Sequence, residues 1–348
     1  MMYYLSNYKR IIITGGAGFI GGALIRALLK KSKAKIFNLD KLGYASDLTG
    51  INENLMKNND LLERYEFIRV DISKEEDVKN VIKRIDPDMI FHLAAESHVD
   101  NSISKPREFI KSNIIGTFNL LESTYEHFSK LKTERKKKFF FQHISTDEVY
   151  GTLDIDGFFN ENSPYCPNSP YAASKASSDH LVRCWNKTYG LPTKITNCSN
   201  NFGPWQHKEK LIPKTILNCM QNKLIPVYGN GQNIRDWLYI DDHIDALLAI
   251  ADKGKIGSTY CIGGNNERTN LEVINNICSL VDLILPIKGS RTNLINFVDD
   301  RLGHDDRYAI DFSKIKNELL WEPNFSFKKG IENTVNWYLN RYKDLINL

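Results

Sequence analysis

Residues 9–21 read Lys9-Arg-Ile-Ile-Ile-Thr-Gly-Gly-Ala-Gly-Phe-Ile-Gly21, and this stretch decides the fold. Lys9 to Thr14 is a short apolar, β-branched run, which predicts a buried strand. Gly15 to Gly21 has a G-x-x-G-x-x-G pattern, and Phe19 to Lys31 continues with the apolar spacing of a helix. Glycines in such a turn let the backbone approach a pyrophosphate, which the helix N-terminus then stabilises. The stretch predicts a dinucleotide site, and the alternative is a tight turn without a ligand.

The rest of the first half repeats the alternation of strand and helix. Alternating strands and helices form right-handed βαβ units, so we expect an α/β fold with a Rossmann-type, doubly wound parallel sheet. Beyond about residue 200 the alternation weakens, which predicts a smaller C-terminal α/β lobe that binds substrate. We expect residues 1–200 to form the nucleotide-binding domain with the catalytic residues, and residues 201–348 to form mainly the second lobe, although the chain can cross between them. Strands are predicted at Lys35–Asp40, Tyr65–Asp71, Met89–Ala95, Phe139–Ser145 and Thr193–Asn197, with helices at Glu75–Ile85 and Lys328–Leu345.

The composition excludes several classes of protein. The 348 residues are 42% hydrophobic and 25% charged, which is typical of a globular protein with a sizeable core. The 46 basic and 42 acidic residues give a net charge of +4, too balanced to indicate a nucleic-acid partner. No apolar run approaches the roughly 20 residues of a membrane helix. The six cysteines form no C-x-x-C pair, so we expect reduced, mostly buried thiols, no metal site and a cytoplasmic location.

Two aspartates follow predicted strands on the nucleotide side. Asp40 ends the second strand about 20 residues after the glycine turn, where a carboxylate accepts hydrogen bonds from the adenosine ribose. Because a carboxylate there repels a 2′-phosphate, we predict NAD rather than NADP. Asp71 ends another strand, and it either bonds the adenine or caps the strand end. The lysine-rich run Lys130 to Lys138 is interpreted as a solvated helix end and loop.

A tyrosine and a lysine mark the catalytic side. Tyr171 and Lys175 are spaced Y-x-x-x-K on a helix expected to begin after Ser169-Pro170, so both lie on one face. An ammonium near a phenol favours the phenolate, and a bound nicotinamide cation would add to this effect. We therefore expect Lys175 and the cofactor to lower the pKa of Tyr171 so that it can act as a base near neutral pH.

The segment Ser145-Thr146-Asp147-Glu148 ends the strand predicted at Phe139–Ser145. Parallel sheets place ligands at the carboxyl ends of their strands, so Thr146 is a candidate for bonding a reacting hydroxyl. Two adjacent carboxyls are more than an alcohol dehydrogenase needs. They indicate an acid and a base with separated pKa values, or else a capped turn.

These motifs together resemble the extended short-chain dehydrogenase/reductases, and within them the nucleotide-sugar dehydratases that act on dTDP-glucose. The likeness runs in order from about Arg10 to Tyr338. It rests on the glycine turn, the tyrosine–lysine pair and three further segments. These segments are His92-Leu-Ala-Ala-Glu-Ser-His-Val-Asp100, Ser145-Thr-Asp-Glu-Val-Tyr-Gly151 and Arg235-Asp-Trp237.

The resemblance implies a lyase, more specifically a hydro-lyase, that makes a 4-keto-6-deoxy nucleotide sugar by an internal redox reaction with tightly bound NAD. Tyr171, with Thr146 and Lys175, removes the 4-hydroxyl proton as hydride leaves C4. Glu148 is similar to the base that removes the C5 proton, and Asp147 is similar to the acid that protonates the departing 6-hydroxyl. Hydride then returns to C6 and C5 is reprotonated, which regenerates NAD in each turnover.

The resemblance also places the binding residues and implies a homodimer held by a four-helix bundle, with interface helices near Arg107–Phe128 and Tyr171–Tyr189. The family usually has proline where Leu302 stands, inside the expected nucleotide clamp. The cofactor contacts implied are Gly15, Gly18, Phe19, Ile20, Gly21, Asp40, Lys41, Leu42, Asp71, Ile72, Leu93, Ala94, Ala95, Ser112, Tyr171, Lys175 and Asn201. The substrate contacts implied are Ser97, Thr146, Asn200, Lys210, Leu211, Pro226, Val227, Tyr228, Arg235, Asn270, Asp300, Arg301 and His304.

Two other interpretations remain at this point. A nucleotide-sugar 4-epimerase or C4 oxidase needs only Tyr171, Lys175 and Thr146, and it gains if either Asp147 or Glu148 points away from the nicotinamide. A catalytically silent NAD-binding sensor module is the second, although such a protein has no use for the tyrosine–lysine pair. Other nucleotide sugars, with UDP, CDP or GDP, are the alternatives to dTDP-glucose.

Overall fold

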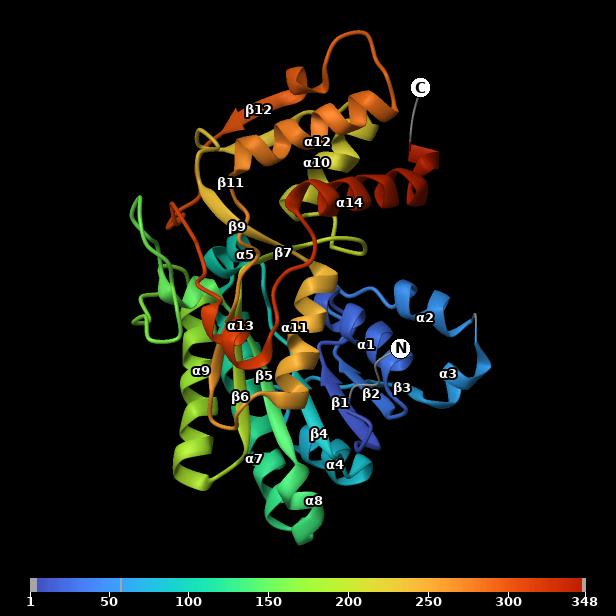
Figure 1. The fold of residues 1–348 in the computed structure, drawn as a ribbon, viewed down its shortest axis with the longest axis vertical. Helices are drawn as coiled ribbons and strands as arrows, with labels where there is room; N and C mark the ends of the chain where they lie inside the picture. Colours follow the sequence, from blue (N-terminus) through green and yellow to red (C-terminus); the bar gives the residue numbers. More distant parts are fainter. Residues whose placement is uncertain (1–4, 57, 346–348) are drawn as a thin grey trace.

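A seven-stranded, wholly parallel sheet forms the centre of the molecule (Figure 1). The computed structural model describes residues 5–56 and 58–345. The strand order β10-β6-β5-β4-β1-β2-β3 is that of a doubly wound sheet with one added strand, which confirms the predicted fold class. The strands are β1 (Arg10–Thr14), β2 (Lys35–Asp40), β3 (Tyr65–Arg69), β4 (Met89–His92), β5 (Phe140–Thr146), β6 (Thr193–Cys198) and β10 (Thr259–Ile262).

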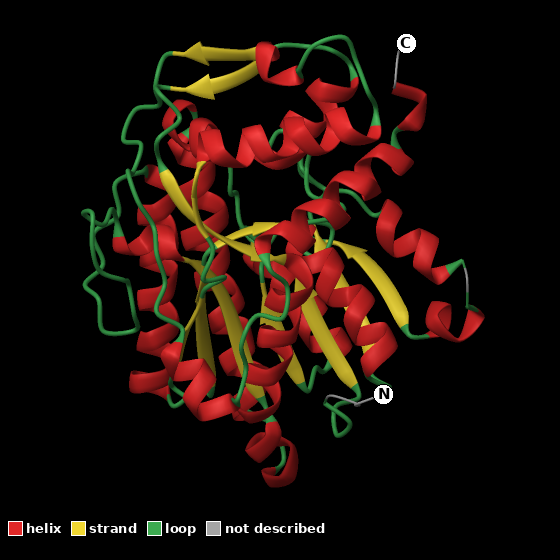
Figure 2. Cartoon of the chain, turned by 45° about the horizontal axis from the view of Figure 1, so that its top comes forward, coloured by secondary structure: helices red, strands yellow, loops and turns green. Residues whose placement is uncertain are grey.

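Helices cover both faces of the sheet because its central strands are apolar on both sides. In β1, Ile11 and Ile13 point to a core shared with α1 (Phe19–Lys31) and α11 (Ile240–Lys253). Ile12 points to the opposite core, shared with α4 (Glu75–Ile85), α7 (Gly116–Ser129) and α9 (Pro170–Tyr189). The strands lie between these two helical layers (Figure 2).

A smaller lobe lies at one end of the sheet, beyond the carboxyl ends of the strands (Figures 1 and 2). It has a three-stranded sheet of order β11-β9-β7 and a two-stranded sheet β12-β8. The strands are β7 (Asn200–Phe202), β8 (Ile225–Tyr228), β9 (Ile234–Tyr239), β11 (Glu267–Thr269) and β12 (Ile295–Val298). Its main helices are α10 (Leu211–Met220), α12 (Asn270–Ile284) and α14 (Phe327–Arg341).

The remaining elements are short. One of them, Ile110–Ile115, is a π-helical turn that joins α6 to α7, and such turns occur often at functional sites. The others are α2 (Thr49–Leu55), α3 (Asn59–Glu63), α5 (Val99–Ser104), α6 (Pro106–Phe109), α8 (Thr133–Lys138), α13 (Ser313–Leu319) and the 3₁₀ turns Asp147–Tyr150, Arg291–Leu294 and Lys343–Leu345.

The chain crosses from the smaller lobe back to the large sheet. After β7, β8 and β9, it runs through α11 and enters β10, which pairs with β6. The last strand of the large sheet therefore comes from residues beyond 200, and the exact division of the chain into two lobes stays a prediction.

Several smaller expectations can be compared directly with the structure. None of the six cysteines is bridged, and four are buried. No described helix is long and apolar enough to cross a membrane. Among the described residues, no group of three or more His, Cys, Asp or Glu side chains is arranged to hold a metal ion.

Candidate active site

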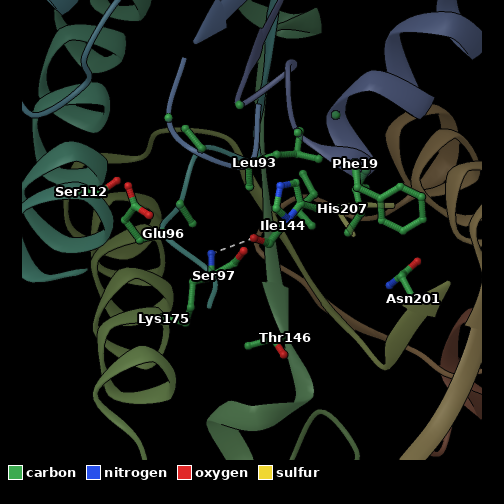
Figure 3. Close-up of a pocket in the computed structure, with 18 of the residues that line it drawn as sticks. Phe19, Leu93, Glu96, Ser97, Ser112, Ile144, Thr146, Lys175, Asn201 and His207 are labelled. Atoms are coloured by element: carbon green, nitrogen blue, oxygen red, sulfur yellow. Dashed lines mark hydrogen bonds between the residues drawn. The ribbon is translucent and has the colours of Figure 1, made fainter. Parts of the chain in front are cut away.

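A deep cavity lies at the carboxyl edge of the large sheet, where several strands end. The glycine turn follows β1, Asp40 ends β2, Leu93 follows β4 and Thr146 ends β5, and residues from all four segments line this cofactor cavity (Figure 3). In an open parallel sheet, this edge is where ligands bind because the connections on either side of a switch point diverge.

The glycine turn brings its backbone to the wall of the cofactor cavity. Gly15 has a φ of +73°, and a Cβ there would lie 2.6 Å from the backbone nitrogen of Ala94. A Cβ on Gly21 would lie 2.3 Å from the carbonyl oxygen of Gly15. Gly18, the N-cap of α1, offers no side chain to cap the helix, so the first amides of α1 keep their hydrogen-bonding capacity for a ligand. The turn therefore fits the pyrophosphate of a dinucleotide.

Asp40 holds the turn in place as well as lining the cavity. One carboxylate oxygen accepts the backbone N–H of Ala17 (3.0 Å). The other accepts the backbone N–H of Leu42 (2.8 Å) and the hydroxyl of Ser46 (3.1 Å). A carboxylate has about four lone-pair positions, so room for a ribose hydroxyl remains.

Two of the expected cofactor residues do not line the cavity. The carboxylate of Asp71 accepts hydrogen bonds from the backbone N–H and hydroxyl of Ser73, which is the strand-end cap that was the alternative interpretation. Leu42 has a φ of 59° and is 37% exposed, because the chain turns outward after Asp40. Their part in cofactor binding stays a prediction, whereas all the other expected cofactor residues line the cavity.

Tyr171 and Lys175 lie one turn apart on α9 and face the cofactor cavity. The helix begins at Pro170, one residue earlier than expected, and the hydroxyl of Ser169 caps it by accepting the N–H of Ala172 (3.0 Å). Lys175 Nζ donates to the carbonyl oxygen of Ile144 (2.8 Å), so it reaches across to β5 (Figure 3). Tyr171 and Lys175 are 8% and 4% exposed, so their charges are governed by burial.

The expected lowering of the Tyr171 pKa is not found. Burial raises the pKa of Tyr171 well above its usual value, and the nearby carboxyl of Glu148 raises it further. Burial also lowers the pKa of Lys175 to about 8, against the attraction of Asp179. The expectation counted the charges of Lys175 and of a bound nicotinamide ring, whereas burial of the phenol and the carboxyl of Glu148 act in the opposite direction.

The two carboxyls after β5 belong to a capped turn and also face the cavity. Thr146 caps the 3₁₀ turn Asp147–Tyr150 by accepting the backbone N–H of Glu148 (3.3 Å). Its hydroxyl donates to one oxygen of Asp147 (3.1 Å), and the other oxygen of Asp147 is buried without a partner. Both predicted alternatives, the capped turn and the carboxyl pair in the cavity, are therefore present together.

The surroundings of the two carboxyls shift their pKa values to different extents. Burial, and then the charge of Glu148, raise the pKa of Asp147 well above its usual value. Burial also raises the pKa of Glu148, but Lys210, Arg235 and Arg301 oppose the rise. Asp147 is thus suited to hold a proton and Glu148 to lose one, which is the arrangement of an acid–base pair.

A second cavity adjoins the first and extends into the smaller lobe. It shares Ser97, Glu148 and Lys210 with the cofactor cavity, and Lys210 Nζ donates to the carbonyl oxygen of Ser97 (3.2 Å). The other expected substrate residues that line this substrate cavity are Asn200, Leu211, Pro226, Val227, Tyr228, Arg235, Asn270, Arg301 and His304.

The arginines expected to hold the diphosphate and the base already bond to other groups of the protein. Arg301 pairs with Asp100 (2.9 Å) and lies over the Tyr228 ring. Arg235 is 6% exposed and donates to backbone carbonyls, including that of Asp305 (2.8 Å).

Asp300 does not line the substrate cavity. It accepts from His304 Nδ1 (2.7 Å), so it orients a lining residue instead of presenting its own carboxylate. Its role as a direct substrate contact therefore stays a prediction.

Comparison with known proteins agrees with this geometry. A sequence model of the GDP-mannose 4,6 dehydratase family matches residues 12–334. The chain belongs to the nucleotide-sugar 4,6-dehydratases. It is 49% identical to a dTDP-glucose 4,6-dehydratase of Neisseria meningitidis over 95% of this chain and 94% of that protein. It is 50% identical to one from Escherichia coli, with the same coverage of both chains.

Solved structures of related dehydratases have the same fold. The dTDP-glucose 4,6-dehydratase of Bacillus anthracis, crystallised with NAD, has a TM-score of 0.82 at 39% identity and covers 97% of this chain and 99% of its own. The Streptomyces venezuelae enzyme, also with NAD bound, has a TM-score of 0.85 at 37% identity, with the same coverage.

The sequence interpretation missed one group of residues in this dehydratase. Tyr44 donates its hydroxyl to Glu209 (2.6 Å), and the imidazole of His207 lies 3.6 Å from the same carboxylate. All three line the cofactor cavity, and Glu209 also lines the substrate cavity. Tyr44 and Glu209 lie on two different loops, 165 positions apart in the sequence. The only available signal was their position beside Lys41 and Lys210.

Proposed function

We propose that this chain dehydrates dTDP-glucose to a 4-keto-6-deoxy sugar nucleotide with NAD as a regenerated cofactor. The observation that carries the proposal is the arrangement of Tyr171, Lys175, Asp147 and Glu148 around one cavity. An epimerase or oxidase at C4 has no use for two further carboxyls. The relatives at 49–50% identity are named for this same reaction.

Each of these residues has one chemical task in the proposed reaction. When bound, NAD accepts hydride from C4 and returns it to C6. Tyr171 takes the 4-hydroxyl proton, and the new ketone makes the C5 proton acidic. Glu148 removes that C5 proton, and Asp147 donates a proton to the departing 6-hydroxyl, which leaves as water. As hydride reaches C6, Glu148 returns a proton to C5, which completes the product. The buried, unpartnered oxygen of Asp147 is free for that contact.

Charge at the junction of the two cavities supports the same assignment. Lys210, Arg235 and Arg301 all act on Glu148 electrostatically. Cations there attract a diphosphate, which links a sugar at the catalytic residues to a base in the substrate cavity. We assign residues 1–200 mainly to cofactor binding and catalysis and residues 201–348 mainly to substrate binding.

Mass spectrometry in heavy water tests the proposed reaction. Purified protein is incubated with dTDP-glucose without added NAD. We expect the loss of one water and the gain of one deuterium, because Glu148 exchanges the C5 proton with solvent and the cofactor is carried by the enzyme. A product of unchanged mass with inverted C4 would indicate an epimerase instead. No reaction with dTDP-, UDP-, CDP- or GDP-glucose, even with added NAD, would contradict catalysis.

We also propose that two copies form a homodimer through a four-helix bundle. Three apolar side chains on the π-helical turn and α7 are exposed: Ile110 (46%), Ile115 (45%) and Phe118 (39%). Tyr189 at the end of α9 is 46% exposed. Because α7 and α9 pack side by side, these residues can supply one apolar face to a partner. A cytoplasmic location remains a prediction from the sequence.

A further inference from the structure

A buried set of charged and polar side chains lies beneath the candidate active site and has no part in the proposed reaction steps. It consists of His143 on β5, Asp179 on α9, Asn197 on β6 and Tyr165 in the loop before α9. His143 is 1% exposed and Asp179 is not exposed at all. Burying an ionised carboxylate is costly unless hydrogen bonds and an opposite charge compensate it. Asp179 therefore needs both hydrogen bonds and a nearby cation to stay ionised.

The hydrogen bonds of Asp179 fix both of its oxygens. One oxygen lies 3.0 Å from His143 Nε2. The other accepts the Tyr165 hydroxyl (2.7 Å) and the side-chain amide of Asn197 (3.1 Å). Burial raises the pKa of Asp179, but the hydrogen bonds from His143 and Tyr165 and the charge of Lys175 oppose the rise, and the pKa lies below its usual value. Asp179 is therefore ionised inside the core.

The cation that faces this carboxylate is Lys175, one helical turn before it on α9. Lys175 Nζ lies 3.4 Å from His143 Nε2, so the imidazole stands between ammonium and carboxylate. His143 Nε2 holds at most one proton, and the shorter contact places that proton toward Asp179. In this arrangement Asp179 compensates the charge of Lys175 without forming a direct ion pair with it. A direct ion pair would draw the ammonium away from the cofactor cavity.

We propose that Asp179, held by His143, Tyr165 and Asn197, is a positioning residue that keeps Lys175 charged and directed at the cofactor cavity. This inference rests on the proposed function, since Lys175 is useful there only as the partner of Tyr171. It assigns a task to a residue that touches neither cofactor nor substrate. It also explains why a carboxylate is tolerated at zero exposure in the core.

The groups around Lys175 leave Asp179 as its nearest counter-charge. The neighbouring titratable side chains are Tyr171, Asp179 and Arg183 on α9, His143 on β5 and Cys198 on β6. Burial lowers the pKa of His143 to about 4 and raises that of Cys198 to about 12, so both are neutral near pH 7. The His92 ring lies tilted against that of His143, with centroids 5.1 Å apart, and burial lowers the pKa of His92 so that it is neutral too. Asp147 and Glu148 act on Tyr171 from the far side.

A direct titration of Lys175 tests the proposal without turnover. Holoenzyme labelled with ¹³C at the lysine Cε is titrated by NMR, with Lys175→Gln and Lys194→Gln used for assignment. Lys194 is the internal control, since burial lowers its pKa also to about 8 but it contacts the carbonyls of Ile250 and Ala251 instead of Asp179. In Asp179→Asn we expect the Lys175 midpoint to fall by about one pH unit or more, with Lys194 unchanged.

The pH profile of kcat tests whether that charge matters in the reaction. A fall of one unit in the Lys175 midpoint moves the alkaline limb of kcat down by the same interval. This lowers kcat about tenfold near pH 9, while kcat near pH 6 and the KM for dTDP-glucose change less than about threefold. Ser178→Ala is the matched control, because it removes buried hydrogen bonds from the same helix to Asn113 and Ser174 without touching Lys175. We expect its profile to keep the wild-type shape.

Several outcomes would overturn the proposal. They are an unchanged Lys175 midpoint in Asp179→Asn, an equal shift of Lys194, or a uniform loss of kcat at all pH values. If Asp179→Asn does not fold, Tyr165→Phe removes one donor and leaves the charge, so the Lys175 midpoint must not fall. A shifted Lys175 midpoint in a protein that leaves dTDP-glucose unchanged would instead contradict the proposed function and leave the electrostatic coupling intact.

Discussion

Asp147 and Glu148 are adjacent in the chain, yet their surroundings give them different tendencies to ionise. Asp147 is buried beside a second carboxyl, so its neutral form is favoured. Glu148 is only half-buried, and Lys210, Arg235 and Arg301 oppose the rise that burial causes in its pKa. A substrate diphosphate near these cations neutralises them in part, so binding strengthens Glu148 as a base. Substrate binding thus prepares the residue that acts next.

Removing the base at Glu148 separates the two stages of the proposed reaction. In Glu148→Gln, oxidation at C4 continues because Tyr171 and Lys175 are intact, but the C5 proton stays. We expect water loss to fall at least about 100-fold and the absorbance of enzyme-bound NADH to accumulate after dTDP-glucose is added. Tyr171→Phe is the control and accumulates none. Elimination by Glu148→Gln at the parent rate would show that another group is the base.

The sequence is informative about residues that belong to a local pattern. The glycine turn, Tyr171 with Lys175, and the carboxyl pair were all found because their spacing along the chain is itself the signal. Asp179 was missed, because a carboxylate four residues after a lysine on a helix is most often an exposed pair. Its burial depends on β5 and β6, and no local pattern reports that packing.

At the scale of elements, α8 shows how a charged run can serve the fold. Thr133–Lys138 has no buried residue, as expected of a solvated segment. Even so, Arg135 donates to Asp86 (2.8 Å) and Asp88 (3.1 Å) and to the carbonyl oxygen of Pro87 (3.2 Å). These partners lie between α4 and β4, so Arg135 of α8 holds the loop that connects α4 to β4.

This role of α8 predicts unequal effects for two of its cations. Arg135→Ala removes ion pairs with both Asp86 and Asp88 and two carbonyl contacts, so we expect the free energy of unfolding to fall by about 1–2 kcal/mol. Lys137→Ala removes only an exposed pair with Glu134 (3.2 Å) and is expected to change it by less than about 0.5 kcal/mol. Urea denaturation measures both variants. Equal effects would mean that α8 is only a solvated segment.

Element boundaries were predictable where the local apolar pattern is strong and less so where tertiary contacts decide them. Phe19–Lys31, Lys35–Asp40 and Glu75–Ile85 have the predicted bounds. The strand expected to reach Ala95 ends at His92: the N–H of Leu93 still bonds the carbonyl oxygen of Thr14 on β1, but the next N–H, that of Ala94, is bonded to the side-chain hydroxyl of Thr14 (3.2 Å). The π-helical turn was not predicted at all, since its Asn113 is held by the distant Glu96 and Ser174.

At the scale of the whole molecule, buried neutral histidines make the free energy of unfolding depend on pH. His243 on α11 is not exposed, and neither ring nitrogen has a hydrogen-bond partner among the described residues. Burial lowers its pKa to about 3. Between about pH 6.5 and pH 3 the unfolded chain binds a proton at this site and the folded chain does not, so stability falls as the pH falls.

Replacing His243 by an apolar residue should therefore flatten the acid dependence of stability. One such histidine costs about 1.4 kcal/mol for each pH unit below about 6.5. We expect His243→Leu to be more stable than the parent near pH 5 by about 2 kcal/mol and to differ less at pH 8. Thermal unfolding as a function of pH measures this. A difference that is the same at pH 5 and pH 8 would contradict the linkage.

The proposed dimer makes a prediction about the apolar face on α7 and α9. Phe118 is 39% exposed on α7 and packs edge-on against Trp185 of α9, so it joins the two helices that would meet a second copy. A charge at its position cannot be buried in an apolar interface without a large cost. We expect Phe118→Arg to convert the dimer to a monomer in sedimentation experiments, with the folded state retained. Leu283→Arg, at a 78% exposed residue of α12 in the other lobe, is the matched control and should leave the assembly unchanged.

Because Ser112 on the adjoining π-helical turn lines the cofactor cavity, loss of the dimer should also weaken NAD retention. A Phe118→Arg protein that remains dimeric would place the interface elsewhere.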